Sequence, residues 1–179
     1  QFLFNSKING LDETDCLLIV GSNVREEAPI INARIRKQVI SRDLPVALIG
    51  ENFDLTYKNE HLGNDVNILT DILYDKNEFS KKLLEAKKPM LIVGQSLLNR
   101  DDSIQIYSLL ESFIEKFNMA NDEWNGFNVL QLSASRAGSL EVGCYQKNKN
   151  LDDIIDDARN KKVRLVMSFG ADEINYQHF

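Results

Sequence analysis

The stretch CLLIVGSNVREEAP, residues 16–29, determines the fold that we expect. It begins with five apolar residues and continues directly into Gly21 and a polar turn. A continuous apolar run of this length is typical of a strand that is buried on both faces, as in a parallel sheet. Because proline suits the first turn of a helix, Pro29 marks a helix start. The stretch therefore predicts a strand, a glycine turn and a helix.

Three further apolar runs have the same design. They are residues 46–49 (VALI), 90–93 (MLIV) and 163–169 (VRLVMSF), and they are followed by Gly50, Gly94 and Gly170. We expect all four runs to be parallel strands of one sheet, with the four glycines at the same edge. A fifth candidate strand, residues 127–132 (FNVLQL), is more polar and is expected nearer an edge of the sheet.

Apolar stripes with helical spacing separate the runs. Their members are Ala28, Ile31, Ile35 and Val39; Ile106, Leu110, Phe113 and Phe117; and Leu151, Ile154, Ile155 and Ala158. Asp101, Asp102 and Asn150 are candidate helix caps, and shorter helices are expected within residues 65–73 and 78–87. The alternation predicts an α/β fold with a doubly wound, mainly parallel, Rossmann-like sheet and helices on both faces, in a single domain over residues 1–179. The first residue is Gln1 and both ends look cut, so we expect a domain from a longer chain.

Composition excludes several classes of protein. The 27 acidic and 21 basic residues give a net charge of −6, which argues against nucleic-acid binding. No apolar stretch reaches the ~20 residues that a membrane span requires, so direct membrane insertion is not expected. The two cysteines, Cys16 and Cys144, are too far apart for an iron–sulfur or zinc motif, and there are only two histidines. We therefore expect no metal in this chain.

The strand ends are the place where chemistry would occur, because ligands of open α/β sheets bind beyond the carboxyl ends of the strands. The turn after residue 20 has only the first glycine of GxGxxG, and P-loop and GxSxG motifs are absent. Glu26 and Glu27 stand at the helix start, where a phosphate would be held, and would repel it. The sequence therefore predicts no catalytic residue and no bound cofactor.

Residues 14–37 (TDCLLIVGSNVREEAPIINARIRK) resemble the molybdopterin-oxidoreductase-like region of the large iron–sulfur (G) subunit family of NADH:quinone oxidoreductase, respiratory complex I. The most specific part is EAPxxNARIRK. Further matching pieces follow in order: VALIG at 46–50, DLTY at 54–57, HLG at 61–63, AKKPM at 86–90 and FGAD at 169–172. The resemblance covers nearly the whole chain.

The resemblance implies a part of the peripheral-arm subunit that passes electrons from NADH toward quinone. Its 2Fe–2S and 4Fe–4S clusters would lie outside this chain, and its partners would be other hydrophilic-arm subunits. It implies a location on the cytoplasmic side of a bacterial inner membrane, or on the mitochondrial matrix side. Gly21, Asn23 and Glu27 match the family's first strand–loop–helix. With Gly50, Gly94 and Gly170, they mark a candidate ancestral cofactor crevice that is no longer used.

Without a catalytic constellation, we expect the domain to act by docking. Arg34, Arg36 and Lys37 on the first helix are the candidate contacts, and an ordinary solvated helix face is the alternative interpretation. Two rival functions stay open: a working molybdopterin-dependent oxidoreductase domain and a generic nucleotide-binding domain. The acids at the first helix disfavour the former, and the missing fingerprint disfavours the latter.

Overall fold

The computed structural model describes residues 3–133, 135–145 and 148–169. The chain divides into two compact units, Gln1–Ala137 and Gly138–Phe179, and each is described by itself. The first unit holds the sheet. Its elements are η1 (Ile8–Asp12), β1 (Cys16–Val20), α1 (Val24–Glu27), α2 (Pro29–Arg42), β2 (Val46–Ile49), β3 (Glu60–Gly63), α3 (Asn67–Leu73), α4 (Phe79–Glu85), β4 (Pro89–Gly94), α5 (Gln95–Leu98), α6 (Ser103–Lys116) and β5 (Phe127–Leu130).

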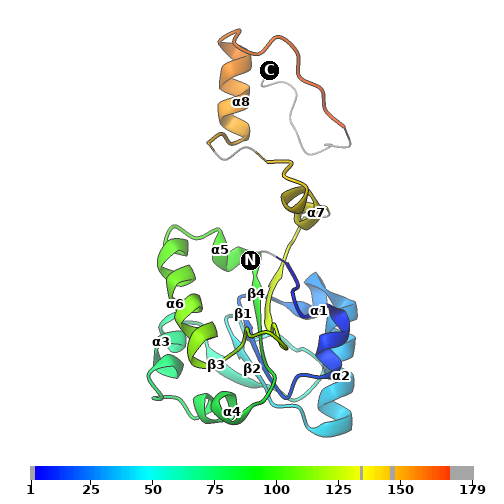
Figure 1. Ribbon diagram of the computed structural model, residues 1–179, viewed down its shortest axis with the longest axis vertical. Coiled ribbons are helices and arrows are strands. Elements are labelled where there is room, and N and C mark those ends of the chain that lie inside the picture. Colours follow the sequence, from blue (N-terminus) through cyan, green and yellow to red (C-terminus); the bar gives the residue numbers. More distant parts are fainter. Residues whose placement is uncertain (1–2, 134, 146–147, 170–179) are drawn as a thin grey trace. The chain divides into compact units, whose positions relative to one another are not determined.

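The five strands form one parallel sheet in the order β3-β2-β1-β4-β5, with α1 and α2 on one face and α3, α4 and α6 on the other (Figure 1). Successive strand residues point to opposite faces. Leu18 and Val20 therefore enter the core under α3, α4 and α6, whereas Leu17 and Ile19 enter the core under α2. Burial on both faces explains why the strands are continuous apolar runs, and the predicted doubly wound α/β class is confirmed.

Three of the four glycine-ended runs are strands of this sheet, namely β1, β2 and β4, and the run at residues 127–130 is the edge strand β5, as expected. β3 was not predicted, because its sequence EHLG has no apolar run and its residues are only half-buried or exposed. The first two apolar stripes lie along α2 and α6, and the shorter helices expected within residues 65–73 and 78–87 are present as α3 and α4.

The N-terminal segment covers the outer edge of β5. The backbone N–H of Val129 donates to the Leu3 carbonyl oxygen at 3.0 Å, and Phe4 forms an antiparallel bridge with Asn128. Asn128 is fully buried, and its Oδ1 accepts the backbone N–H of Ser6 at 3.0 Å. Residues at the start of the chain therefore complete the hydrogen bonding of an edge strand that would otherwise be open.

The second unit contains α8 (Leu151–Arg159), and α7 (Arg136–Glu141) spans the boundary between the units. Asn150 caps α8 as predicted: its side chain accepts the Asp153 N–H at 2.9 Å, and the Asp153 carboxylate accepts the Asn150 N–H at 2.8 Å. For α6, the candidate Asp102 does occupy the N-cap position, but its side chain makes no capping bond and instead accepts two hydrogen bonds from Arg100.

The strand predicted at residues 163–169 is wrong. The segment has no strand hydrogen bonding, and Leu165, Met167 and Phe169 are exposed to solvent. The apolar run predicted a strand from composition, but a parallel strand also needs a neighbour, and the described part of the second unit offers none. Gly170, the predicted end of this run, lies outside the described residues.

Candidate functional site

The strand order reverses between β1 and β4, and this switch point is where open α/β sheets bind ligands. Gly21, Gly50 and Gly94 stand together at this edge as predicted, since a Cβ on Gly50 would lie 3.6 Å from the Gly21 Cα. The turn after β1 favours glycine, because Gly21 has a φ of +64°. The loops that follow β1, β2 and β4 therefore meet at this edge of the sheet.

The two loops at the switch point are packed against each other. A Cβ on Gly94 would lie only 2.0 Å from the Gly21 carbonyl oxygen, and the Ser96 hydroxyl donates to that same oxygen at 2.8 Å. Gln95 is buried, and its Oε1 accepts the backbone N–H of Leu132 at 2.9 Å. The loops after β1, β4 and β5 thus form hydrogen bonds with one another, and these bonds occupy backbone groups that a ligand at this edge would need.

Glu27 turns back into the β1 loop. Its carboxylate accepts hydrogen bonds from the Ser22 hydroxyl at 2.8 Å and from the Asn23 backbone N–H at 2.9 Å. Ser22 is buried, whereas Glu27 itself is exposed. The Glu27 carboxylate therefore accepts the hydrogen bonds that Ser22 and Asn23 could otherwise donate to a phosphate in this loop.

The next loop is acidic and also internally paired. The Arg25 guanidinium contacts the Asp54 carboxylate at 2.9 Å and donates to the Asp54 carbonyl oxygen at 2.8 Å. The pKa of the Asp54 carboxyl lies below its usual value, because the Thr56 backbone N–H donates to it and Arg25 lies beside it. On β3, His61 Nε2 lies 2.7 Å from the Gly50 carbonyl oxygen.

The residues at this edge do not fit the phosphate-bearing pterin cofactor of a working molybdopterin oxidoreductase. Residues 21–27 and 50–54 carry four acids (Glu26, Glu27, Glu51 and Asp54) and one base, Arg25, which is already paired with Asp54. The buried side-chain atom left without a partner here, Asn23 Oδ1, is placed as an acceptor and would not bind a phosphate oxygen.

We expect Glu27→Ala to lower the free energy of unfolding by about 1–2 kcal/mol, the usual cost of losing charge-assisted hydrogen bonds. Glu26→Ala is the matched control, since it removes the same charge from the same helix turn, but the Glu26 side chain has no hydrogen bond or ion pair among the described residues. Urea denaturation of both variants measures the difference. Equal losses would mean that the contacts with Ser22 and Asn23 contribute nothing.

No group of three or more His, Cys, Asp or Glu side chains that could hold a metal occurs among the described residues. The described helices include none that is long and apolar enough to cross a membrane. Cys16 is buried in β1, and burial, with Asp15 nearby, raises the pKa of its thiol to about 12. Cys144 is exposed, and both thiols are free.

The two cysteines are therefore expected to react at very different rates, because the thiolate is the reactive form. With a disulfide reagent at pH 8, the native chain should release one equivalent of chromophore, from Cys144, and the second only after denaturation. Cys144→Ser should abolish the fast phase, and Cys16→Ser should leave it intact. Two fast equivalents from the native wild-type chain would contradict the burial of Cys16.

The candidate docking residues on α2 are not equivalent. The Arg34 guanidinium contacts the Asp12 carboxylate at 2.7 Å, and Arg36 Nε donates to the Thr56 carbonyl oxygen at 3.2 Å. Lys37 has no hydrogen bond or ion pair within the described part of the chain. Sequence reasoning could not separate the three, because the partners of Arg34 and Arg36 lie 22 and 20 residues away.

Comparison with known proteins gives three informative relatives. The chain is 42% identical over 176 residues to the G subunit of NADH-quinone oxidoreductase from Rickettsia typhi, 98% of this chain and 25% of the relative. It is 39% identical over 177 residues to the mitochondrial NADH-ubiquinone oxidoreductase 78 kDa subunit of Neurospora crassa, 98% of this chain and 23% of the relative. It is 34% identical over 178 residues to the NADH-ubiquinone oxidoreductase 75 kDa subunit of Reclinomonas americana, 99% of this chain and 26% of the relative.

These matches confirm the resemblance to the large iron–sulfur subunit family of complex I that residues 14–37 indicated. The chain spans about a quarter of the length of the curated relatives that it matches. The family model described as molybdopterin oxidoreductase matches residues 1–178, and so this chain belongs to the molybdopterin oxidoreductase family.

Proposed function

We propose that this chain is a segment of the large iron–sulfur subunit in the hydrophilic arm of an NADH:quinone oxidoreductase, and that it serves there as a docking domain. Relatives at 34–42% identity over at least 98% of the chain are named as the G subunit, the 78 kDa subunit or the 75 kDa subunit of NADH-quinone or NADH-ubiquinone oxidoreductase. Electrons would pass from NADH toward quinone through clusters held by other parts of the subunit. Its partners would be neighbouring hydrophilic-arm subunits, on the cytoplasmic or matrix side of the membrane.

The observation that carries the docking role is the closure of the strand-end crevice. The fold supplies a switch point, but the Gly21 carbonyl oxygen lies against Gly94, and Glu27 takes the donors of Ser22 and Asn23. Function has to be argued from a site and not from a fold. Because the chain's own groups occupy the candidate edge, the crevice is a vestige of a cofactor site. The domain therefore functions through the contacts that its surface makes.

The two rival functions predict different contents for the purified protein. A working molybdopterin oxidoreductase domain would retain molybdenum and a fluorescent oxidised pterin, and a nucleotide-binding domain would retain or bind a nucleotide. The acidic edge disfavours both ligands, because each carries phosphate. Within the described residues, no geometric feature favours either rival over docking.

The proposal is tested in the intact respiratory complex. Elemental analysis and pterin fluorescence should show no stoichiometric molybdenum or pterin, and this chain alone should not oxidise NADH with an artificial acceptor. A complex whose large subunit lacks the segment that corresponds to this chain (residues 1–179 in the present numbering) should assemble in much lower yield on native gels. Stoichiometric molybdenum would refute the vestigial crevice, and normal assembly without the segment would refute the docking role.

A further inference from the structure

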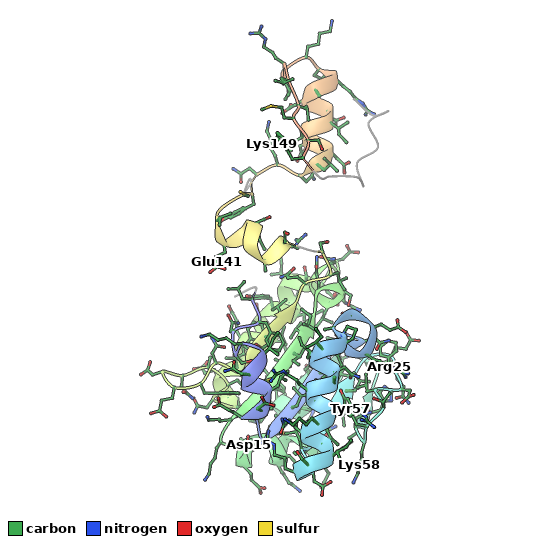
Figure 2. All side chains as sticks on the ribbon, turned by 90° about the vertical axis from the view of Figure 1, so that its right-hand side faces the viewer. Asp15, Arg25, Tyr57, Lys58, Glu141 and Lys149 are labelled. Carbon is green, nitrogen blue, oxygen red and sulfur yellow. The ribbon has the colours of Figure 1, made fainter. Side chains whose placement is uncertain are left out.

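The outer face of α2 carries a seam made by Ile30, Ala33, Lys37 and Ile40, three apolar side chains and one lysine. Ile30 is 71% exposed and Ile40 is 66% exposed, whereas the inner face of the same helix places Ile35 fully in the core. In Figure 2, α2 lies on the side of the first unit that faces the viewer. Single exposed isoleucines are ordinary, but two on one stripe of one helix form a surface that a second element can cover.

The seam has the spacing of a helix-packing surface. Its members follow one another at intervals of three, four and three residues, so they lie in one row along the helix. The same 3–4 spacing places side chains into the grooves of a facing helix in bundles and coiled coils. The seam therefore fits another helix better than it fits a strand or a small molecule.

The charge of α2 indicates which kind of helix fits. Residues 29–42 contain Arg34, Arg36, Lys37 and Arg42 and no acid, in a chain whose net charge is −6. Arg34 and Arg36 are held at the sides of the seam by Asp12 and Thr56. Lys37 stands within the seam and has no hydrogen bond or ion pair among the described residues.

We infer that the seam on α2 binds an amphipathic helix of a different subunit, with apolar residues facing Ile30 and Ile40 and a carboxylate facing Lys37. The inference rests on the proposed docking function and names the chemistry of its partner. A symmetric α2–α2 contact with a second copy of this chain does not fit, because it would oppose Lys37 and its arginine neighbours with like charges. A 14-residue helix is about 21 Å long, so the contact is one part of a larger interface.

The test uses the intact complex, in which a photo-crosslinking amino acid replaces Ile40 of this chain, or Ile104 as control. Ile104 is 77% exposed but lies on α6, outside the seam. Irradiation should crosslink position 40 to a helical peptide of another subunit that carries Asp or Glu. A product with a second copy of the same subunit, a product with a basic peptide, or no product would overturn the inference.

Matched variants test the energetics in the same complex. Ile30→Asp with Ile40→Asp, and separately Lys37→Glu, should lower the yield of assembled complex by about fivefold or more, which corresponds to roughly 1 kcal/mol. Ile104→Asp and Lys81→Glu, at exposed positions on α6 and α4, should change the yield by less than about twofold. Lys37→Arg should retain assembly. The melting temperatures of the purified large-subunit variants should match the wild type, because the substituted side chains are exposed.

Assembly of the seam variants and assembly without the segment report on the seam and on docking separately. If the seam variants assemble normally while removal of residues 1–179 prevents assembly, docking uses another surface and only the inference is wrong. If removal of the segment also leaves assembly unchanged, the docking function itself is wrong. A loss with Ile104→Asp equal to that with the seam variants would also overturn the inference.

Discussion

Gly94→Ala is expected to lower the free energy of unfolding by about 3 kcal/mol or more, at the upper end of the cost of overpacking. The new Cβ would lie 2.0 Å from the oxygen and 2.7 Å from the carbon of the Gly21 carbonyl group. Both are backbone atoms in the turn that follows the neighbouring strand β1, so no rotamer change can relieve the clash. The loops after β1 and β4 would have to separate, and the Ser96–Gly21 hydrogen bond would be lost with them.

Gly138→Ala is the matched control. A Cβ at Gly138 would meet nothing within 4 Å, and the residue lies in α7, where alanine is favoured over glycine by about 1 kcal/mol. Urea denaturation followed by far-UV circular dichroism measures both variants. A Gly94→Ala variant as stable as the wild type would show that the two loops are not closed on each other, and it would remove the main support for a vestigial crevice.

Phe113→Ala is expected to cost about 3–5 kcal/mol, the range found for removing a buried phenylalanine. Phe113 lies on the inner face of α6, fully buried, with its ring centroid 4.6 Å from that of Phe117. The core between α6 and the sheet cannot collapse around the lost ring without moving the helix, so most of the cavity should persist.

The comparison for Phe113 is Ile104→Ala on the same helix, at a side chain that is 77% exposed. We expect it to change stability by less than about 0.5 kcal/mol, as for other surface substitutions. Equilibrium unfolding should show a lower midpoint for Phe113→Ala with an unchanged slope. Similar losses at both positions would mean that α6 faces the sheet differently from the arrangement in Figure 1.

The sequence predicted the central sheet well, because β1, β2 and β4 are buried on both faces and have to be apolar throughout. The same reasoning could not find β3, whose residues Glu60 and His61 look like a loop. Its place in the sheet comes from pairing with β2, with Ala47 opposite Glu60, and that pairing leaves no mark on the local pattern. Tertiary hydrogen bonding decides such edge strands.

The reverse error arose at residues 163–169, where an apolar run predicted a strand that the structure does not form. Apolar character records a preference for burial, but it does not supply a neighbouring strand. Arg164 also interrupts the run, and every residue of the run except the half-buried Val163 is exposed.

The candidate site was predictable in its position but not in its contacts. Glycine after an apolar run located the edge, and two acids before Pro29 indicated that phosphate would be repelled. The direction of Glu27, which accepts from Ser22 and Asn23, depends on how α1 turns, and no spacing rule reports it. The partners of Arg34 and Arg36 are likewise set by the packing of η1 and the β2–β3 loop against α2.

The hydrogen bond between Ser6 and Asn128 joins residues that are 122 positions apart, so it forms late during synthesis of the chain. A chain leaves the ribosome from its N-terminus at about 5–20 residues per second, so residues 3–6 would wait roughly 6–25 s before their strand exists. β1 likewise receives its second neighbour only when β4 has emerged. The nascent chain therefore carries a central strand β1 that is paired on one side only until β4 has emerged, and residues 3–6 lack their partner until β5 is made. This interval is when a chaperone would have most to protect.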